Sequence, residues 1–272
     1  MIDQSVQEKL REQYNPDGSA LRNVQMRLLD ILIEFDRVCR GIGVRYWLDS
    51  GTLIGAVRHG GFIPWDDDLD VCMLRKDYLK YRKRIQDELR PPYSLSDVDM
   101  KSGHQYTWCR IVDEATVVER KRTDGNTQNV NIWLDVFPMN RGKSLFARHI
   151  NKLYGRCFRR KYHVINDGRW KYCVSVVLYP FLLAAVSALR VIGSLIDRGN
   201  LDHDFGSGFY SKRRICDTFP LGTVVFENHV FPAPANCDAY LKGIFGDYSK
   251  LPDENLRQNH DFVLAVENER VE

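Results

Sequence analysis

Closely spaced aspartates make the segment 46–71 the chemically densest part of this 272-residue chain. On a strand, side chains at alternate positions share a face, so Asp68 and Asp70 are predicted to point the same way. Two carboxylates held side by side repel each other unless a cation lies between them. Hard oxygen ligands of this kind favour Mg²⁺ or Mn²⁺. The pair therefore predicts a metal site of the type that promotes in-line phosphoryl displacement.

A third carboxylate, Asp135, lies within the apolar segment 133–137. A buried carboxylate without a partner is costly, so Asp135 should have a metal ion, a cation or a proton. We expect it to complete the metal site with Asp68 and Asp70.

Two other interpretations of the acidic segment stay open. It could be a solvent-exposed acidic turn. It could also be a calcium loop, because Asp66, Asp68 and Asp70 match positions 1, 3 and 5 of an EF-hand. The glycine that such a loop requires is replaced by Val71, and its terminal glutamate by Asp77.

A glycine and a threonine upstream of the acids indicate a phosphate site. Gly51 and Thr52 lie between a predicted strand and a predicted short helix, where glycine allows close approach and the helix offers free N–H groups. Arg58 and His59 follow on the same element and are expected to contact donor phosphate, Arg58 through a bidentate fork. An ordinary turn is the alternative for Gly51 and Thr52, and for His59.

Tryptophans cluster in the same half of the chain. Aromatic faces bind quaternary ammonium groups by cation–π attraction, so Trp65, directly beside the acids, and Trp108 are candidates for stacking on choline or a nucleobase. Packing against a sheet is the alternative.

Hydrophobic spacing predicts the elements that carry these residues. Apolar residues at three- and four-residue intervals predict a helix over 20–40, ended by Gly41 and Gly43. Further elements are expected as follows: strands over 44–48, 70–74, 104–120 and 130–137, a short helix over 51–53, and an amphipathic helix over 76–89.

The segment 141–173 is strongly basic, although the net charge of the whole chain is only +3. It holds ten lysines and arginines against one acid, Asp167, which is typical of a surface for an anionic partner or of a solvated helix face. An apolar run over 174–196 follows. Because Pro180 and Arg190 interrupt it, and a membrane span needs about 20 apolar residues, we expect either a buried helix or a helix lying in a membrane interface.

Composition indicates an ordinary globular protein, and the small net charge gives no reason to expect a nucleic-acid partner. Seven cysteines without close pairing, such as Cys72 and Cys173, predict free and mostly buried thiols in a reducing compartment. The first residues lack a secretory pattern, so the expected location is cytoplasmic, with peripheral contact at the inner face of an anionic membrane.

Three segments resemble the LicD family, whose animal relatives include the fukutin-related proteins. They read YWLDSGTLIGAVRHGGFIPWDDDLDV (46–71), WLDVFP (133–138) and AYLKGIFGDY (239–248). The first is long and specific. The resemblance covers about 21–140 and 215–260, and the weaker match over 141–214 is where acceptor choice is expected to be determined.

The resemblance implies an α/β (α+β) fold with a polymerase-β-like nucleotidyltransferase core, a mixed sheet and flanking helices. It assigns Asp68 and Asp70 as paired metal ligands and Asp135 as the third acid, and it places Asp66 at a position that binds metal or the acceptor hydroxyl. Gly51 and Thr52 take the glycine–serine position, and Arg58 would contact the donor phosphates.

The function predicted is a metal-dependent phosphotransferase. It moves phosphocholine, or a similar phospho-alcohol, from a CDP-linked donor such as CDP-choline to a hydroxyl of a lipid-linked cell-surface glycan. Asp135 or Asp66 would take the proton of that hydroxyl. Two alternatives are a nucleotide-sugar glycosyltransferase with an Asp-x-Asp metal site and a non-catalytic metal- or glycan-binding protein.

Three regions are expected in the chain. Residues 1–140 form the catalytic core, 141–214 a basic and apolar helical insert that faces the membrane or acceptor, and 215–272 a part that packs back on the core.

Overall fold

A computed structural model describes residues 2–97, 106–121, 127–141, 147–162, 167–257 and 262–263. Its α-helices are α1 (Gln4–Tyr14), α2 (Ala20–Ile42), α3 (Ser50–Ile54), α4 (Arg75–Glu88), α5 (Ala147–Lys161), α6 (Arg169–Ile196), α7 (Ile215–Thr218) and α8 (Cys237–Phe245). A π-helical turn covers Gly55–His59, and a 3₁₀ turn covers Glu254–Leu256.

The strands form a mixed sheet and a separate hairpin. They are β1 (Tyr46–Leu48), β2 (Asp70–Leu74), β3 (Tyr93–Ser96), β4 (Cys109–Lys121), β5 (Thr127–Arg141), β6 (Asn200–His203), β7 (Arg213–Arg214), β8 (Gly222–Phe226), β9 (His229–Ala233) and β10 (Phe262–Val263). In the sheet the order is β1-β2-β5-β4-β10, with β3 beside β4 and β6 between β5 and β7; β8 and β9 pair with each other. Strands β2 and β5 are parallel, whereas β1–β2 and β4–β5 are antiparallel.

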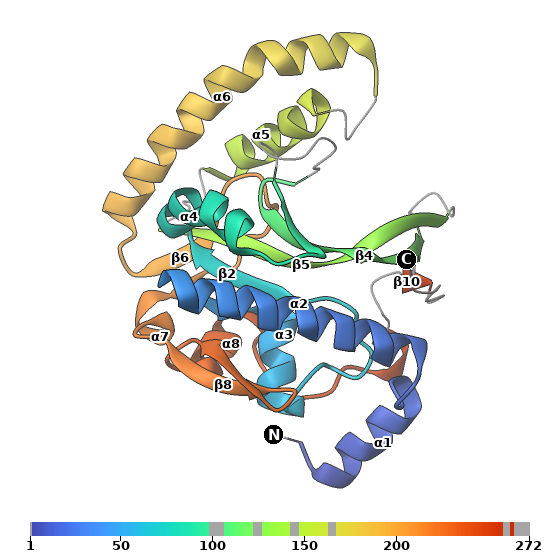
Figure 1. Ribbon diagram of the computed structural model, residues 1–272. Helices are drawn as coiled ribbons and strands as arrows, with labels where there is room; N and C mark the ends of the chain where they lie inside the picture. Colours follow the sequence, from blue (N-terminus) through green and yellow to red (C-terminus); the bar gives the residue numbers. More distant parts are fainter. Residues whose placement is uncertain are drawn as a thin grey trace.

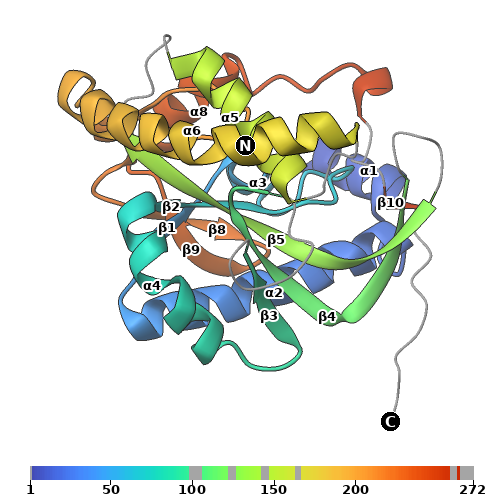
Figure 2. The ribbon, with the colours of Figure 1, turned by 90° about the horizontal axis from the view of Figure 1, so that it is seen from above.

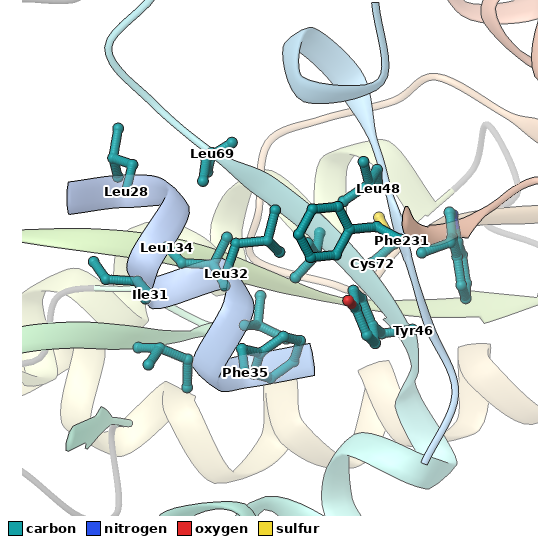
Figure 3. Packing of buried hydrophobic residues seen from close by; sticks show 14 of the residues in the cluster. Leu28, Ile31, Leu32, Phe35, Tyr46, Leu48, Leu69, Cys72, Leu134 and Phe231 are labelled. Atoms are coloured by element: carbon teal, nitrogen blue, oxygen red, sulfur yellow. The ribbon is translucent and has the colours of Figure 1, made fainter. Parts of the chain in front are cut away.

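Helix α2 covers one face of this sheet (Figure 1). Ser19 caps its first turn by accepting the Arg22 N–H, and Gly43 ends it in the left-handed conformation, at φ 70°. Figure 3 shows its apolar stripe, including Ile31 and Leu32, lying over Leu134 of β5. The predicted helix over 20–40 is therefore confirmed, and its stripe forms the centre of the core.

The C-terminal part packs on the same core. Phe226, Phe231 and Tyr240 are buried in one cluster with α2 and the sheet. The carboxylate of Glu227, in the β8–β9 turn, accepts two hydrogen bonds from Arg22 of α2 (3.0 and 2.6 Å) and one from the Phe62 N–H (3.1 Å). The hairpin is therefore tied both to α2 and to the loop that precedes the acids.

Helices α5 and α6 lie against each other on the opposite side of the sheet from α2 (Figures 1 and 2). They form a second cluster around Tyr154, Phe158, Tyr179 and Val186. Only 22% of the most apolar part of α6 is buried, so the structure does not favour the first of the two alternatives for 174–196, a buried helix, and the interfacial helix stays a prediction. Its outer face carries solvent-exposed apolar side chains along its whole length.

The sequence-based fold class is confirmed, since the chain is mixed α/β with a mixed sheet and flanking helices. The division at residues 140 and 214 stays a prediction. All seven cysteines are free, as expected, but burial differs among them: Cys72 is buried, whereas Cys173 is exposed on α6.

Candidate functional site

The predicted acids come together where the start of β2 lies beside the middle of the parallel strand β5. Asp70 of β2 lies directly opposite Asp135 of β5, so the two carboxylates leave the same face of the sheet. Strand β2 begins at Asp70, which means that Asp68 precedes the strand instead of lying within it. Burial still alternates there: Leu69 and Val71 are buried and Asp68 and Asp70 partly exposed, so the expected shared face is kept.

Repulsion among these acids is strong. Burial, followed by the charges of Asp68 and Asp135, raises the pKa of Asp70 well above its ordinary value, and Asp49 and Asp66 add to the shift. Such a cluster has a local excess of negative charge, which a divalent cation would relieve.

The Asp135 carboxylate already accepts several hydrogen bonds. Its Oδ1 accepts from Trp108 Nε1 (2.6 Å) and from Arg110 Nε (2.8 Å), and its Oδ2 accepts from Trp133 Nε1 (3.0 Å). The expectation that a buried Asp135 must have a partner is therefore met by a cation and two indoles. Its role as a metal ligand stays a prediction.

The donor set fits a Mg²⁺ or Mn²⁺ ion that is completed by substrate. In the part of the chain that is described, no three His, Cys, Asp or Glu side chains converge as a preformed metal site. Mg²⁺ in phosphotransferases is commonly held by one or two carboxylates plus substrate phosphates. Asp68 and Asp70, whose charges repel each other, match that arrangement.

Gly51 is placed against the acids by α3. A Cβ at this position would lie 2.9 Å from Asp66 Oδ2 and 4.0 Å from Asp68 Oδ1. A residue with a side chain at position 51 would therefore collide with Asp66, and only glycine allows the backbone to approach this carboxylate so closely. The Asp70 N–H donates to Thr52 Oγ1 (2.8 Å), which joins α3 to the start of β2. Gly51 and Thr52 thus border the acid cluster, and phosphate contact by them stays a prediction.

Arg58 and His59 lie in the buried π-helical turn behind this loop. Arg58 donates through Nη1 to the carbonyls of Tyr248 (2.8 Å) and Lys250 (3.2 Å), and through Nε to His59 (2.8 Å). Burial lowers the pKa of Arg58 to about 10 despite the opposing charge of Asp66. Burial and the charge of Arg58 lower the pKa of His59 to about 3, so His59 is neutral near pH 7 and adds no positive charge. Donor contact by either residue stays a prediction.

The two candidate stacking tryptophans have different surroundings. Trp65 is buried, with Tyr14 at 5.3 Å and the Arg257 guanidinium at 5.4 Å from its ring. Trp108 is partly exposed, lies between Tyr106 and Phe137, and borders a small hollow with Phe137 and His203. Trp108 donates a hydrogen bond to Asp135, and ligand stacking stays a prediction for both.

Sequence reasoning missed a buried ion pair behind the site. Asp49 accepts from Arg213 Nε (3.1 Å), Arg213 Nη2 (2.5 Å) and the Tyr240 hydroxyl (2.6 Å). Burial opposes ionisation of Asp49, but the charge of Arg213 and these hydrogen bonds hold its pKa below its ordinary value. Asp49 adjoins the Gly51 loop, and its N–H donates to the Asp70 carbonyl (3.1 Å). The only local signal was an aspartate next to the glycine motif.

Arg110 was also missed, because a single arginine in a predicted strand looks like an ordinary exposed residue. It lies opposite Asp135 in β4, and its guanidinium stacks between the rings of Tyr106 (3.9 Å) and Trp133 (4.1 Å).

Comparison with known proteins agrees with this geometry. The family described as LicD/FKTN/FKRP, nucleotidyltransferase domain, matches residues 43–165, which contain all four predicted acids. The chain is 35% identical to lipopolysaccharide cholinephosphotransferase LicD of Haemophilus influenzae, over 90% of this chain and 97% of that protein. The chain belongs to the LicD family.

More distant relatives of this LicD-family chain share only part of it. Ribitol 5-phosphate transferase FKRP of Homo sapiens is 33% identical over 38% of this chain and 19% of its own length. An uncharacterized Rickettsia typhi protein is 50% identical over 24% of this chain. The predicted family is thus confirmed, and with it the class of LicD-type phosphotransferases.

Proposed function

We propose that this LicD-family enzyme transfers a phospho-alcohol, phosphocholine first among the candidates, from a CDP-linked donor to a hydroxyl of a cell-surface glycan. The observation that carries the proposal is Asp70, held beside Asp68 and opposite Asp135 in a cluster whose mutual repulsion calls for a cation. The relatives named as cholinephosphotransferase and ribitol 5-phosphate transferase support a phospho-alcohol as the transferred group.

Asp68 and Asp70 would hold the Mg²⁺ or Mn²⁺ ion. When bound, that ion supplies charge neutralisation for the phosphoryl oxygens and for the leaving nucleoside monophosphate. The chain's own groups must then orient donor and acceptor and accept the proton of the attacking hydroxyl.

Asp66 is our candidate for the proton acceptor. Its Oδ2 lies close to the Gly51 backbone, which also approaches Asp68. Gly51 leaves room for a phosphate to approach the backbone, and Thr52 fixes the start of β2. Arg58 supports that loop from behind through the carbonyls of Tyr248 and Lys250.

The alcohol group of the donor is proposed to lie on Trp108. This partly exposed ring donates through its indole N–H to Asp135 and lies beside Phe137, at 4.9 Å between ring centroids. A quaternary ammonium next to such a ring gains cation–π attraction without needing a hydrogen-bond donor.

Donor binding can be tested without knowing the acceptor. Calorimetry should detect binding of CDP-choline only when Mg²⁺ or Mn²⁺ is present, and slow transfer to water should release CMP. The variants Asp68→Asn and Asp70→Asn should lose metal-dependent binding. Asp87→Asn, an exposed acid on α4, serves as the matched control and should behave as wild type.

CDP-ribitol, CDP-glycerol and a nucleotide sugar complete the panel. Binding of another CDP-alcohol in place of CDP-choline would keep the reaction and change the transferred group. Metal-dependent binding of the nucleotide sugar alone would favour the glycosyltransferase alternative. Equal donor binding by Asp70→Asn and wild type would overturn the proposed site.

We also propose that α6 holds the enzyme against an anionic membrane, near a lipid-linked acceptor. Its exposed apolar side chains form one continuous stripe at helical spacing, which includes Trp170, Val177, Phe181 and Leu195, exposed by 60–69%. The opposite stripe packs on α5, so an in-plane orientation follows more naturally than a span. The neighbouring cations of α5 match anionic lipid: Arg148, Lys152, Arg156, Arg159, Arg160 and Lys161.

Vesicle sedimentation tests this location. The chain should bind vesicles of equal phosphatidylglycerol and phosphatidylcholine at low salt, and the double variant Val177→Asp/Phe181→Asp should not. Val225→Asp, at a valine of the β8–β9 hairpin that is 52% exposed, is the matched control. Absence of vesicle binding by wild type, or a concentration-dependent dimer lost in the double variant, would overturn the membrane proposal.

A further inference from the structure

Three facing residues on adjacent strands form a row across the sheet at the acid cluster. Arg110 of β4 lies opposite Asp135 of β5, which in turn lies opposite Asp70 of β2. Residues directly opposite each other extend from the same face, and neighbouring strands are about 4.8 Å apart. The Arg110 backbone is therefore roughly 10 Å from that of Asp70, a gap that its side chain and a bound phosphate can bridge together.

The guanidinium of Arg110 is held unusually firmly for a partly exposed arginine. It stacks between two rings, 3.9 Å from the centroid of Tyr106 and 4.1 Å from that of Trp133, and its side chain is 15% exposed. Its Nε donates to Asp135 Oδ1 at 2.8 Å. The planar group is thus fixed in position and rotation before any ligand arrives, so little side-chain entropy remains to be lost on binding.

Most of its donors remain available. An arginine has five N–H donors, and among the described residues Asp135 is the only hydrogen-bond or ion-pair partner of Arg110. The other basic side chains near the site differ in this respect, because Arg213 is bound to Asp49 and Arg58 to backbone carbonyls. A fixed, partly exposed guanidinium with free Nη groups beside an acidic cluster is a site for an anion with paired oxygens.

The geometry points to Arg110 as an anion-binding residue of the active site, with its Nη groups contacting the pyrophosphate of the nucleotide donor. This inference rests on the proposed function, since it takes the donor to be a nucleoside diphosphate ester. Asp135 then acts as a positioning residue that orients Arg110. A phosphate here would be contacted on one side by Arg110 and face the Asp68–Asp70 pair on the other.

Binding of inorganic pyrophosphate with Mg²⁺, measured by calorimetry, tests the inference separately from catalysis. Arg110→Gln should weaken pyrophosphate binding by about 10- to 100-fold, the range expected for charge-assisted hydrogen bonds. Arg110→Lys keeps the charge but not the fork, so its loss should be intermediate. Arg84→Gln, an exposed arginine of α4, is the matched control and should bind as wild type.

A second variant tests the inference even if Arg110→Gln does not fold. Tyr106→Leu leaves the charge and the Asp135 contact in place but removes one stacking ring, and it should weaken pyrophosphate several-fold and raise the donor KM more than it lowers kcat. Thermal unfolding of each variant accompanies the titrations. A purely structural Arg110 would lower the unfolding temperature and leave pyrophosphate affinity unchanged, which would overturn the inference.

The two proposals fail in different ways. If wild type binds neither pyrophosphate nor a CDP-alcohol with metal, the proposed donor is wrong and the Arg110 inference falls with it. If wild type binds both and folded Arg110→Gln binds them equally well, only the role of Arg110 is wrong.

Discussion

Removing Arg213 should lower the free energy of unfolding of this protein more than removing a surface ion pair would. Arg213 and Asp49 have side chains that are 1% and 0% exposed, and two hydrogen bonds of 3.1 and 2.5 Å join them. In Arg213→Gln the carboxylate of Asp49 keeps the Tyr240 hydroxyl at 2.6 Å, the Ser50 hydroxyl at 3.1 Å and His203 Nε2 at 3.8 Å. A buried charge then lacks its counter-ion.

The expected cost follows from that environment. Breaking one side of a buried, hydrogen-bonded ion pair typically costs about 3–5 kcal/mol, because the remaining charge is uncompensated. For a chain of this size each kcal/mol lowers the unfolding temperature by roughly 2 °C, so a drop of roughly 6–10 °C is expected. Exposed pairs contribute at most about 1 kcal/mol.

Urea and thermal unfolding of four proteins and one control variant measure this loss of stability. They are wild type, Arg213→Gln, Asp49→Asn and the double variant, with Lys242→Gln as the control for an exposed pair whose side chains are about 60% accessible. The double variant has no orphaned charge, so it should cost at least about 2 kcal/mol less than the sum of the single variants.

Two results would refute the reasoning. A cost below about 1 kcal/mol for Arg213→Gln would mean that water or a neighbour compensates Asp49. If the losses in unfolding free energy of the two single variants add up to the loss of the double variant, the two side chains do not stabilise each other in the folded chain.

Three further predictions concern the loop and the acids. Gly51→Ala should reduce transfer activity strongly, and stability by about 1–3 kcal/mol, because its Cβ would lie 2.9 Å from Asp66 Oδ2; CMP release and urea unfolding check this, with Gly41→Ala, which meets nothing within 4 Å, as control. In His59→Gln the free energy of unfolding should fall less steeply than in wild type as the pH is lowered. The folded pKa of about 3 lies below the ordinary 6.5, so His59 contributes stability above pH 6.5 that is lost as pH falls toward 3. Wild type should therefore lose about 2 kcal/mol more than the variant between pH 7.5 and 5 in urea titrations. Asp70→Asn should raise the unfolding temperature of the metal-free protein by a few degrees, since it removes a carboxyl group that the charges of Asp68 and Asp135 repel. A calorimetric scan that shows a lower temperature would contradict this.

Local pattern was sufficient to predict most elements between residues 20 and 137 and to select the candidate acids. The stripe of α2 repeats every three or four residues, and the segment around Asp68 and Asp70 alternates apolar and acidic positions. Such periodicities reflect the geometry of a helix or a strand within a few residues, so they can be read without knowledge of the fold. The long motif over 46–71 identified the family for the same reason, because all of its residues are adjacent in the chain.

Partners that are distant in the sequence could not be assigned in this way. Asp49 and Arg213 are 164 positions apart, and no local sequence pattern around either residue indicates that the other is its partner. The pairing of Arg110 with Asp135 depends on the register of β4 against β5, which the packing of the whole sheet fixes. The contacts of Arg58 with C-terminal carbonyls and of His59 with Gln7 of α1 likewise join distant parts of the chain and could not be read from the local sequence.

The sequence by itself determined the family, the order of most elements between residues 20 and 137, and the carboxylates that are candidates for binding a cation, since these depend on residue type and short-range spacing. Only the tertiary structure decided which charges are compensated and which remain available. Asp135 is neutralised by Arg110, Asp49 by Arg213, and Asp70 is left among like charges. It also decided that the apolar run of α6 has an exposed face, because the exposure of a side chain depends on what packs over it.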